Sequence, residues 1–310
     1  MSYTPPYFLF NAHFETIYPS LLRRVYAQPY VRERIATPDD DFLDLDWLKK
    51  GSEKLIIISH GLEGNSRRPY VVGMAKAGYD NGFDILAWNF RGCSEEMNRQ
   101  LRFYHSGATD DLDVVVQHAL KSGYKKIYLV GFSLGGNLTL KYLGEQKNSA
   151  PIQKAVAFSV PMDLHSSCVK ISQPGNWIYA NRFLKSLKKK IIGKSAVKPE
   201  LDIRGMQSIN TLIDFDNRYT APLHGYQNAI DYYTQCSSIH FVSSIAVPTL
   251  IINAKNDPFL SASCYPAELL KDHPLVRFES PVHGGHVGFA QFSKNGLYWS
   301  EERAIDFFTV

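Results

Sequence analysis

The chain has 310 residues, of which 45% are hydrophobic and 21% are charged, a composition typical of a globular protein with a sizeable core. The formal net charge of +4 is too small to indicate binding to nucleic acid, and no apolar run is long enough to cross a membrane. The first residues carry neither a basic segment nor a long apolar one, so we expect no signal peptide and a cytoplasmic location. The four cysteines lack the spacing of a metal site, which favours reduced thiols.

The pattern of strands begins with a hairpin. Residues 31–36 and 42–47 flank a turn rich in aspartate and predict two strands. In the second of them, leucines and a tryptophan alternate with Asp44 and Asp46, which is typical of a half-buried strand. The aspartates could indicate a divalent-metal site, but a solvated turn and an outward strand face explain them more simply.

Short, continuous apolar runs follow, as expected for strands buried on both faces of a parallel sheet. They span residues 55–58, 83–88, 127–130, 155–160, 249–254 and, more weakly, 276–280. Helical patterns lie between these runs, among them 69–79, a helix with Thr109 as its N-cap, and a terminal helix around residues 304–308. This alternation predicts an open, mostly parallel sheet with helices on both faces and a site at the carboxyl ends of the strands.

The stretch from residue 161 to residue 248 breaks the alternation and is too long for an unstructured loop. We predict a mostly helical cap over residues 163–220, followed by a helix around residues 225–234. Within the cap, residues 181–193 carry an apolar stripe at helical spacing, which favours a surface helix packed on the core. Alternatively, its basic face could make weak contact with anionic lipid through Lys185, Lys188, Lys189 and Lys190.

A serine lies where a buried strand meets a helix. The apolar run from Ile127 leads into Gly131-Phe-Ser133-Leu-Gly135, and a helical pattern follows. In this context G-x-S-x-G marks a nucleophile elbow. The glycines leave room for the backbone to pass closely, and the helix N-terminus offers free N–H groups to an oxyanion. The sequence therefore predicts Ser133 as a nucleophile.

A serine nucleophile needs a base and a group that orients the base, here in the chain order Ser, Asp or Glu, His. We favour Asp257, just past a buried strand, as the acid; Asp163, after the preceding strand, is the alternative. The base should follow the last strand, where His283 and His286 lie beside three glycines. We favour His286, because the segment beyond it can anchor it. Metal ligation by the two histidines is disfavoured, since no further ligand has suitable spacing.

The oxyanion of the tetrahedral intermediate needs two N–H donors. One is the backbone N–H of Leu134, directly after the serine, and the other should come from the loop after the strand 55–58. That loop reads His60-Gly-Leu-Glu-Gly64, and we assign its donor to the backbone N–H of Leu62. His60 itself is interpreted as structural.

Together these residues resemble the YheT-like α/β-hydrolases, a group related to mammalian abhydrolase-domain lipases and to yeast ethanol acyltransferase/esterase enzymes. The resemblance runs nearly end to end. Its motifs are Asn11-x-His13 with Thr16, Leu21-Leu-Arg-Arg24, His60-Gly-Leu-Glu-Gly64, Asn89-Phe-Arg-Gly-Cys93, Tyr104-His-Ser-Gly107, Gly131-Phe-Ser-Leu-Gly-Gly136, Tyr219-Thr-Ala-Pro222 with Gly225-Tyr226, Asn256-Asp-Pro258 and His283-Gly-Gly-His-Val-Gly-Phe289.

The resemblance implies a single α/β-hydrolase domain over residues 1–310, with a helical cap inserted after the sixth strand. It also implies the triad Ser133, Asp257 and His286, no cofactor, and hydrolysis of acyl esters of small alcohols, glycerides or phospholipids. The motifs at residues 89–93 and 104–107 receive no catalytic role and are expected to shape loops behind the site.

Three functions remain in competition. The leading hypothesis is a serine carboxylesterase or lipase-like enzyme acting on a small or lipid-like ester. An acyltransferase with an alcohol acceptor would use the same triad. A non-enzymatic binding protein on this fold is disfavoured because no triad member is missing, and a dehalogenase is disfavoured because its nucleophile would be an aspartate at position 133. The sequence favours no oligomeric state.

Overall fold

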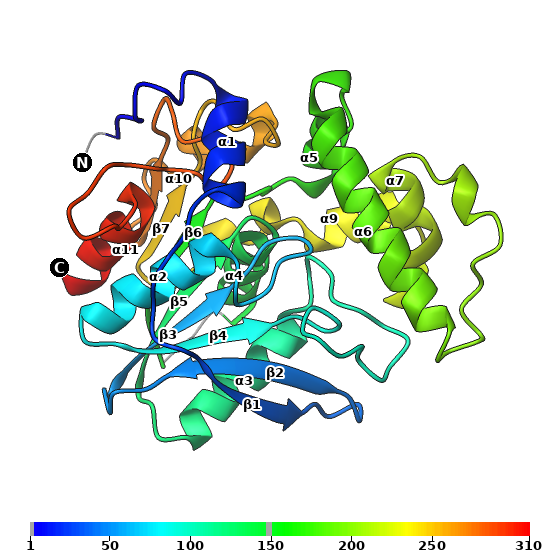
Figure 1. The fold of residues 1–310 in the computed structure, drawn as a ribbon, viewed down its shortest axis with the longest axis horizontal. Helices are drawn as coiled ribbons and strands as arrows, with labels where there is room; N and C mark the ends of the chain where they lie inside the picture. Colours follow the sequence, from blue (N-terminus) through cyan, green and yellow to red (C-terminus); the bar gives the residue numbers. More distant parts are fainter. Residues whose placement is uncertain (1–2, 147–150) are drawn as a thin grey trace.

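The structure is a computed structural model that describes residues 3–146 and 151–310. Its centre is an eight-stranded sheet in the order β1-β2-β4-β3-β5-β6-β7-β8 (Figure 1). The strands are β1 (Val31–Ala36), β2 (Phe42–Leu48), β3 (Lys54–Ser59), β4 (Asp84–Asn89), β5 (Lys126–Phe132), β6 (Ile152–Phe158), β7 (Thr249–Ile252) and β8 (Val276–Glu279). β2 pairs antiparallel with β1 and β4, and the remaining pairs are parallel. The predicted hairpin and mostly parallel sheet are therefore confirmed.

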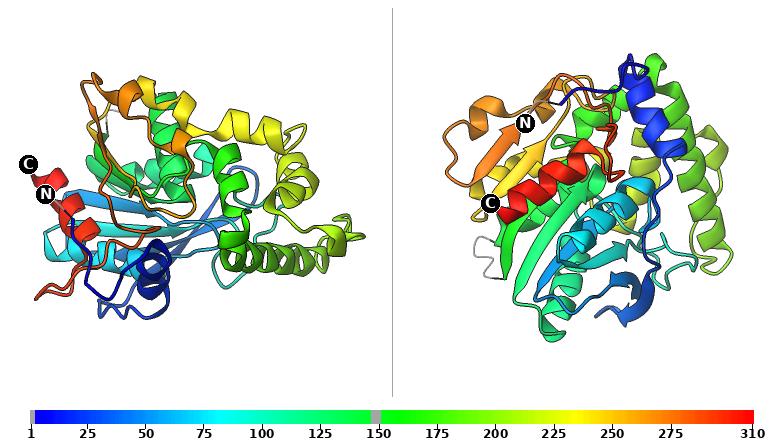
Figure 2. Two further views of the ribbon diagram at one scale, coloured as in Figure 1. Left: turned by 90° about the horizontal axis from the view of Figure 1, so that it is seen from above. Right: turned by 60° about the vertical axis from the view of Figure 1, so that its left-hand side comes forward.

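Helices cover both faces of the sheet, as predicted (Figures 1 and 2). On one face lie α2 (Pro69–Asp80) and α11 (Trp299–Thr309), which pack on side chains such as Ile56 and Ile58. On the other lie α3 (Thr109–Lys121) and α4 (Leu134–Gln146), which pack on side chains such as Ile57. Successive residues of β3 thus serve opposite layers, because strand side chains alternate. Thr109 is the first residue of α3 rather than its N-cap, since the capping position belongs to Ala108.

A group of helices follows the sixth strand and lies beyond one end of the sheet (Figure 1). It contains α5 (Leu164–Ile171), α6 (Trp177–Ser195), α7 (Leu212–Phe215), a π-helical turn at Asp216–Thr220, α8 (Ala221–Leu223) and α9 (Ala229–Cys236). These elements share an apolar cluster that is separate from the two clusters on the sheet. The helical insertion after β6 is confirmed. Its extent as a cap, residues 163–220, stays a prediction, because α9 belongs to the same cluster.

Short helices complete the described parts of the chain. Near the N-terminus, α1 (Ala12–Leu21) lies beside the loops that follow β7 and β8, and α10 (Ala267–Leu270) precedes β8 (Figure 1). The 3₁₀ turns are Pro174–Asn176, Met206–Ser208, Ser238–His240, Val242–Ser244 and Ala262–Cys264. Within residues 3–146 and 151–310, no helix combines the length and the apolar character needed to traverse a bilayer.

The expectation of a solvated face on β2 is wrong, because every residue of this strand is buried. The register places Arg34 opposite Asp44 and Arg32 opposite Asp46, with ion-pair distances of 2.7 and 2.8 Å. Burial alone raises the pKa of Asp44, but the hydrogen bonds and charge of Arg34 bring it below its ordinary value. The aspartates are thus neither solvated nor arranged for a metal, since cross-strand arginines allow their burial.

The motif at residues 89–93 also makes buried ion pairs and hydrogen bonds with the hairpin. Arg91 is 2% exposed and pairs with Asp41 at 2.9 Å and with Asp111 at 2.7 Å. The amide of Asn89 donates to Asp46 at 2.9 Å. These contacts tie the hairpin, β4 and α3 together, which gives the motif a structural role.

Candidate active site

Ser133 occupies the single position between β5 and α4. Its φ of +53° lies in the left-handed region, a conformation that L-residues other than glycine adopt rarely. The turn is held by its N–H, which donates to the carbonyl of Phe158 at 2.9 Å. A Cβ on Gly135 would come within 2.4 Å of two backbone oxygens, and one on Gly131 within 2.4 Å of another. Only glycine fits at both positions, which accounts for the spacing of the motif.

His286 lies between Ser133 and Asp257 and contacts both. Its Nε2 is 2.9 Å from Oγ of Ser133, and its Nδ1 is 2.8 Å from Oδ2 and 3.1 Å from Oδ1 of Asp257. Because an ionised carboxylate can only accept, Nδ1 carries the proton and Nε2 is free to accept the serine proton. Asp257 is 4% exposed and also accepts the N–H of Phe259 at 2.9 Å.

The two alternative residues lie elsewhere. Asp163 is the N-cap of α5 and accepts the N–H of Ser166 at 3.1 Å and the hydroxyl of Ser263 at 2.7 Å. His283 turns toward Glu15, with its side chain 48% exposed. The structure therefore brings together Ser133, His286 and Asp257 and leaves the other candidates outside this group.

The two predicted N–H donors lie on either side of the serine. A Cβ on Gly61 would be 3.2 Å from Cβ of Ser133, so the loop that carries Leu62 runs directly over this serine. Leu134 begins α4, and the first N–H groups of a helix have no partner within it. Within the described ranges, neither Leu62 N–H nor Leu134 N–H donates to a protein group. Both are therefore available to an anionic oxygen.

His60 braces the loop that carries Leu62. Its Nε2 accepts the N–H of Phe90 at 3.2 Å, so Nδ1 carries the proton and lies 2.8 Å from the carbonyl of Gly61. Burial lowers the pKa of His60 to about 3. A neutral, fully buried imidazole of this kind supports the loop and does not exchange protons with a substrate.

The profile of a family described as "alpha/beta hydrolase fold" matches residues 54–292. The chain belongs to the α/β-hydrolase family. It is 36% identical to "Putative esterase YheT" of Escherichia coli, over 97% of this chain and 91% of that protein. It is 28% identical to "Medium-chain fatty acid ethyl ester synthase/esterase 2" of Saccharomyces cerevisiae, over 86% and 64%.

Solved structures agree on the fold of this α/β hydrolase. The esterase Pf2001 of Pyrococcus furiosus superposes with a TM-score of 0.60 at 20% identity, covering 93% of this chain and 96% of that one. The family and the names of its relatives make the protein an enzyme of the esterase and lipase type.

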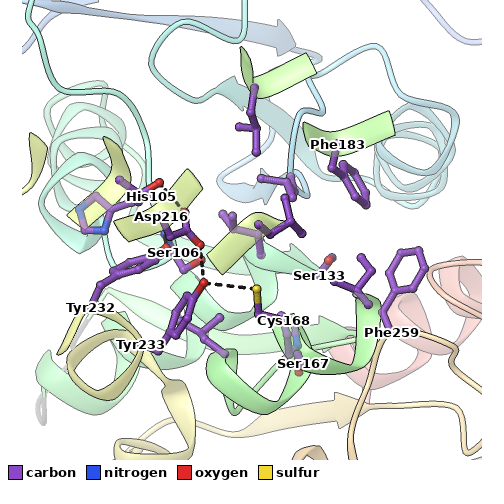
Figure 3. Close-up of a pocket in the computed structure, with 18 of the residues that line it drawn as sticks. His105, Ser106, Ser133, Ser167, Cys168, Phe183, Asp216, Tyr232, Tyr233 and Phe259 are labelled. Atoms are coloured by element: carbon purple, nitrogen blue, oxygen red, sulfur yellow. Dashed lines mark hydrogen bonds between the residues drawn. The ribbon is translucent and has the colours of Figure 1, made fainter. Parts of the chain in front are cut away.

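A cavity of about 140 Å³ opens beside Ser133 and His286 (Figure 3). Its walls are mainly apolar and include Leu62, Leu134, Leu164, Phe183, Leu187 and Phe259. The motif at residues 104–107 contributes His105 and Ser106 to the same wall. Some of these residues come from the segments that follow the strands, and others come from the insertion, so the helices after β6 cover the cavity of this α/β hydrolase.

A polar group lies on the side of the cavity away from Ser133 (Figure 3). The hydroxyl of Tyr233 donates to Oδ2 of Asp216 at 2.6 Å and lies 3.3 Å from Sγ of Cys168. Burial raises the pKa of Asp216 to about 6, although hydrogen bonds from Thr220 and Tyr233 oppose the rise. Sequence reasoning missed these residues, because they meet only when α5, α9 and the π-helical turn pack together.

Helix α6 supplies part of the cavity wall through its apolar stripe, so it packs on the core as expected. The basic face is smaller than predicted, however, because Lys190 points inward to Glu63 at 2.6 Å. Lys185 and Lys189 remain exposed and Lys188 is half-buried. Contact of this face with anionic lipid stays a prediction, with vesicle co-sedimentation as its test.

Proposed function

We propose that this hydrolase cleaves carboxylic esters of small alcohols or glycerides, with Ser133 as nucleophile, His286 as base and Asp257 as the group that orients it. The observation that carries the proposal is the unbroken chain of hydrogen bonds from Ser133 through His286 to Asp257, at the wall of an apolar cavity. A serine hydroxyl is a weak nucleophile until a base accepts its proton, and this arrangement supplies that base.

The reaction follows from this geometry. Oγ of Ser133 attacks the ester carbonyl while Nε2 of His286 takes the hydroxyl proton, and the N–H groups of Leu62 and Leu134 bind the resulting oxyanion. The bond to the alkoxy oxygen then breaks, and His286 returns the proton to the leaving alcohol. Water attacks the acyl-enzyme with His286 again as base, which releases the acid and restores Ser133.

The cavity indicates the kind of acyl group. Its volume resembles that of an apolar cavity of about 150 Å³ that accommodates benzene, so a short acyl chain matches it better than a long one. The apolar walls favour a hydrocarbon over a charged group.

A series of p-nitrophenyl esters from acetate to palmitate tests the proposal, with Ser133→Ala measured beside the wild type. We expect activity with short chains, loss of activity in the variant, and labelling of the wild-type serine by a fluorophosphonate. Full esterase activity in Ser133→Ala would contradict the proposed mechanism.

Acyl transfer to an alcohol is the second candidate, and the yeast relative named both as a synthase and as an esterase of ethyl esters favours it. The acyl-enzyme would then pass its acyl group to an alcohol instead of water. Adding ethanol at rising concentration to the p-nitrophenyl ester assay separates the two, because transfer yields an ethyl ester. Absence of the ethyl ester at high ethanol would leave hydrolysis as the sole activity.

A further inference from the structure

Glu15 is a buried carboxylate that the proposed reaction does not use. It lies in α1, is 1% exposed, and has the half-exposed His283 as its one ion-pair partner among the residues described. Burying a carboxylate is unfavourable unless hydrogen bonds replace its water. Those hydrogen bonds come from the loops that carry the proposed triad.

The carboxylate joins the loop of His286 to the loop of Asp257. Oε2 of Glu15 accepts the N–H of Gly284 at 2.5 Å and the side-chain amide of Asn256 at 3.1 Å. Asn256 directly precedes Asp257, and its Oδ1 accepts the N–H of Gly285 at 3.0 Å. One buried side chain thus fixes the spacing of two loops whose catalytic members must meet within hydrogen-bond distance.

Thr16, the next residue of α1, holds His286 itself. Its Oγ1 accepts the backbone N–H of His286 at 2.9 Å and donates to the carbonyl of Ala12 at 2.7 Å. The hydroxyl is therefore oriented by the helix before it reaches the loop. Removing it would leave the N–H of His286 without this acceptor.

The glycines of the loop allow it to lie against α1. A Cβ on Gly285 would be 2.8 Å from Oγ1 of Thr16, and one on Gly288 would be 2.2 Å from the carbonyl oxygen of Glu15. Any side chain at either position would push the loop off the helix. The glycine-rich motif near the C-terminus and the motif near the N-terminus, which includes Thr16, are therefore two halves of one contact.

We propose that Glu15 and Thr16 are positioning residues that set the orientation of His286 toward Ser133 and Asp257. The inference rests on the proposed function, since it assigns these residues to the triad. Their substitution is expected to act on the chemical step more than on substrate binding, because neither residue lines the cavity.

The test compares Thr16→Val with Thr16→Ser and adds Glu15→Gln, using p-nitrophenyl butyrate. Valine keeps the shape of threonine without its hydroxyl, so kcat should fall about 10- to 100-fold while KM changes less than about twofold. Serine retains the hydroxyl and should keep kcat within about twofold of the wild type. Glu15→Gln replaces an acceptor by an amide and should lower kcat in the same way.

Thr309→Val is the matched control, because the Thr309 hydroxyl also bonds the helix carbonyl four residues earlier, at 2.9 Å, but lies outside the site. It should leave kcat unchanged. If Thr16→Val keeps wild-type kcat, the positioning role of Thr16 is refuted, whether or not Glu15→Gln folds. If Ser133→Ala is active, the proposed function itself fails; if Ser133→Ala is inactive but Thr16→Val and Glu15→Gln are normal, only this inference fails.

Discussion

Nζ of Lys190 lies 2.6 Å from Oε1 of Glu63, so the longest helix of the insertion is tied to the loop that carries Leu62. Both side chains are largely shielded from water, and Glu63 also accepts from the hydroxyls of Tyr104 and Ser186. Movement of α6 and the position of the proposed Leu62 donor are therefore linked.

Replacing Lys190 by Met should destabilise the protein by about 3 kcal/mol, because the buried carboxylate of Glu63 loses its cation. Adding Glu63→Gln to this variant should recover part of the loss, since the uncompensated charge is then removed. Urea unfolding measures both. Lys185→Met, on the exposed face of the same helix, should change the free energy of unfolding by less than about 0.5 kcal/mol. An equally small effect of Lys190→Met would show that the pair is not buried in solution.

Asp257→Asn should lower kcat by about 10⁴-fold with little change in KM, because the amide no longer fixes the tautomer of His286. Asp163→Asn is the matched control, since Asp163 was the rival acid and asparagine is an equally good helix N-cap. It should keep kcat within about twofold. The reverse outcome would assign the acid to Asp163.

Gly135→Ala should be poorly tolerated, because its Cβ would meet the carbonyl oxygens of Ser59 and His60 at 2.4 Å. Since these contacts are with backbone atoms, the turn at Ser133 itself must shift. We expect the free energy of unfolding to fall by about 1–3 kcal/mol or more and the esterase activity to be lost. Gly175→Ala has open space around its Cβ and should leave both unchanged. Thermal unfolding and p-nitrophenyl butyrate assays decide between these outcomes.

The raised pKa of Asp216 predicts that the stability of the protein depends on pH. Burial raises its pKa to about 6 from the ordinary value of 3.8, so between these values the folded protein binds more protons than the unfolded chain. The contribution of Asp216 to stability must then decrease as pH rises from about 4 to about 6 and stay low above it. Asp216→Asn should flatten this part of a Tm-against-pH profile, whereas the exposed Asp272→Asn should leave it unchanged.

The same group should affect binding. Above pH 6 an ionised carboxylate faces the apolar cavity, so KM for a butyrate ester should rise through this range in the wild type and stay level in Asp216→Asn. A pH-independent KM in the wild type would mean that the acyl chain does not reach Asp216.

The sequence predicted those features that depend on local patterns. Apolar runs located the strands of the parallel sheet, and the strand–Ser133–helix context located the elbow, because buried strands and tight turns impose their own residue types. Placing Asp257 and His286 at strand ends then followed from the topology, since the carboxyl ends of parallel strands share one edge of the sheet.

What escaped prediction depends on partners far apart in the chain. Asp44 and Asp46 look solvated until Arg34 and Arg32 are seen across the hairpin, and Lys190 looks exposed until Glu63 is placed beneath it. No spacing rule relates Glu15 to Gly284, because the contact forms only in the complete fold. The periodicity of a sequence indicates which side of an element is apolar, but it does not indicate which buried polar groups form hydrogen bonds or ion pairs with one another.

The contact of α1 with the loop of His286 also bears on the order of steps by which the protein folds. About 270 residues separate Glu15 from Gly284, so α1 can make this contact only after the sheet and its last loops have formed. During refolding, the far-ultraviolet circular dichroism of the sheet and helices should therefore return before esterase activity does. Simultaneous recovery of the two signals would contradict this order, whereas a lag would agree with docking of α1 as a late step that turns a folded chain into an enzyme.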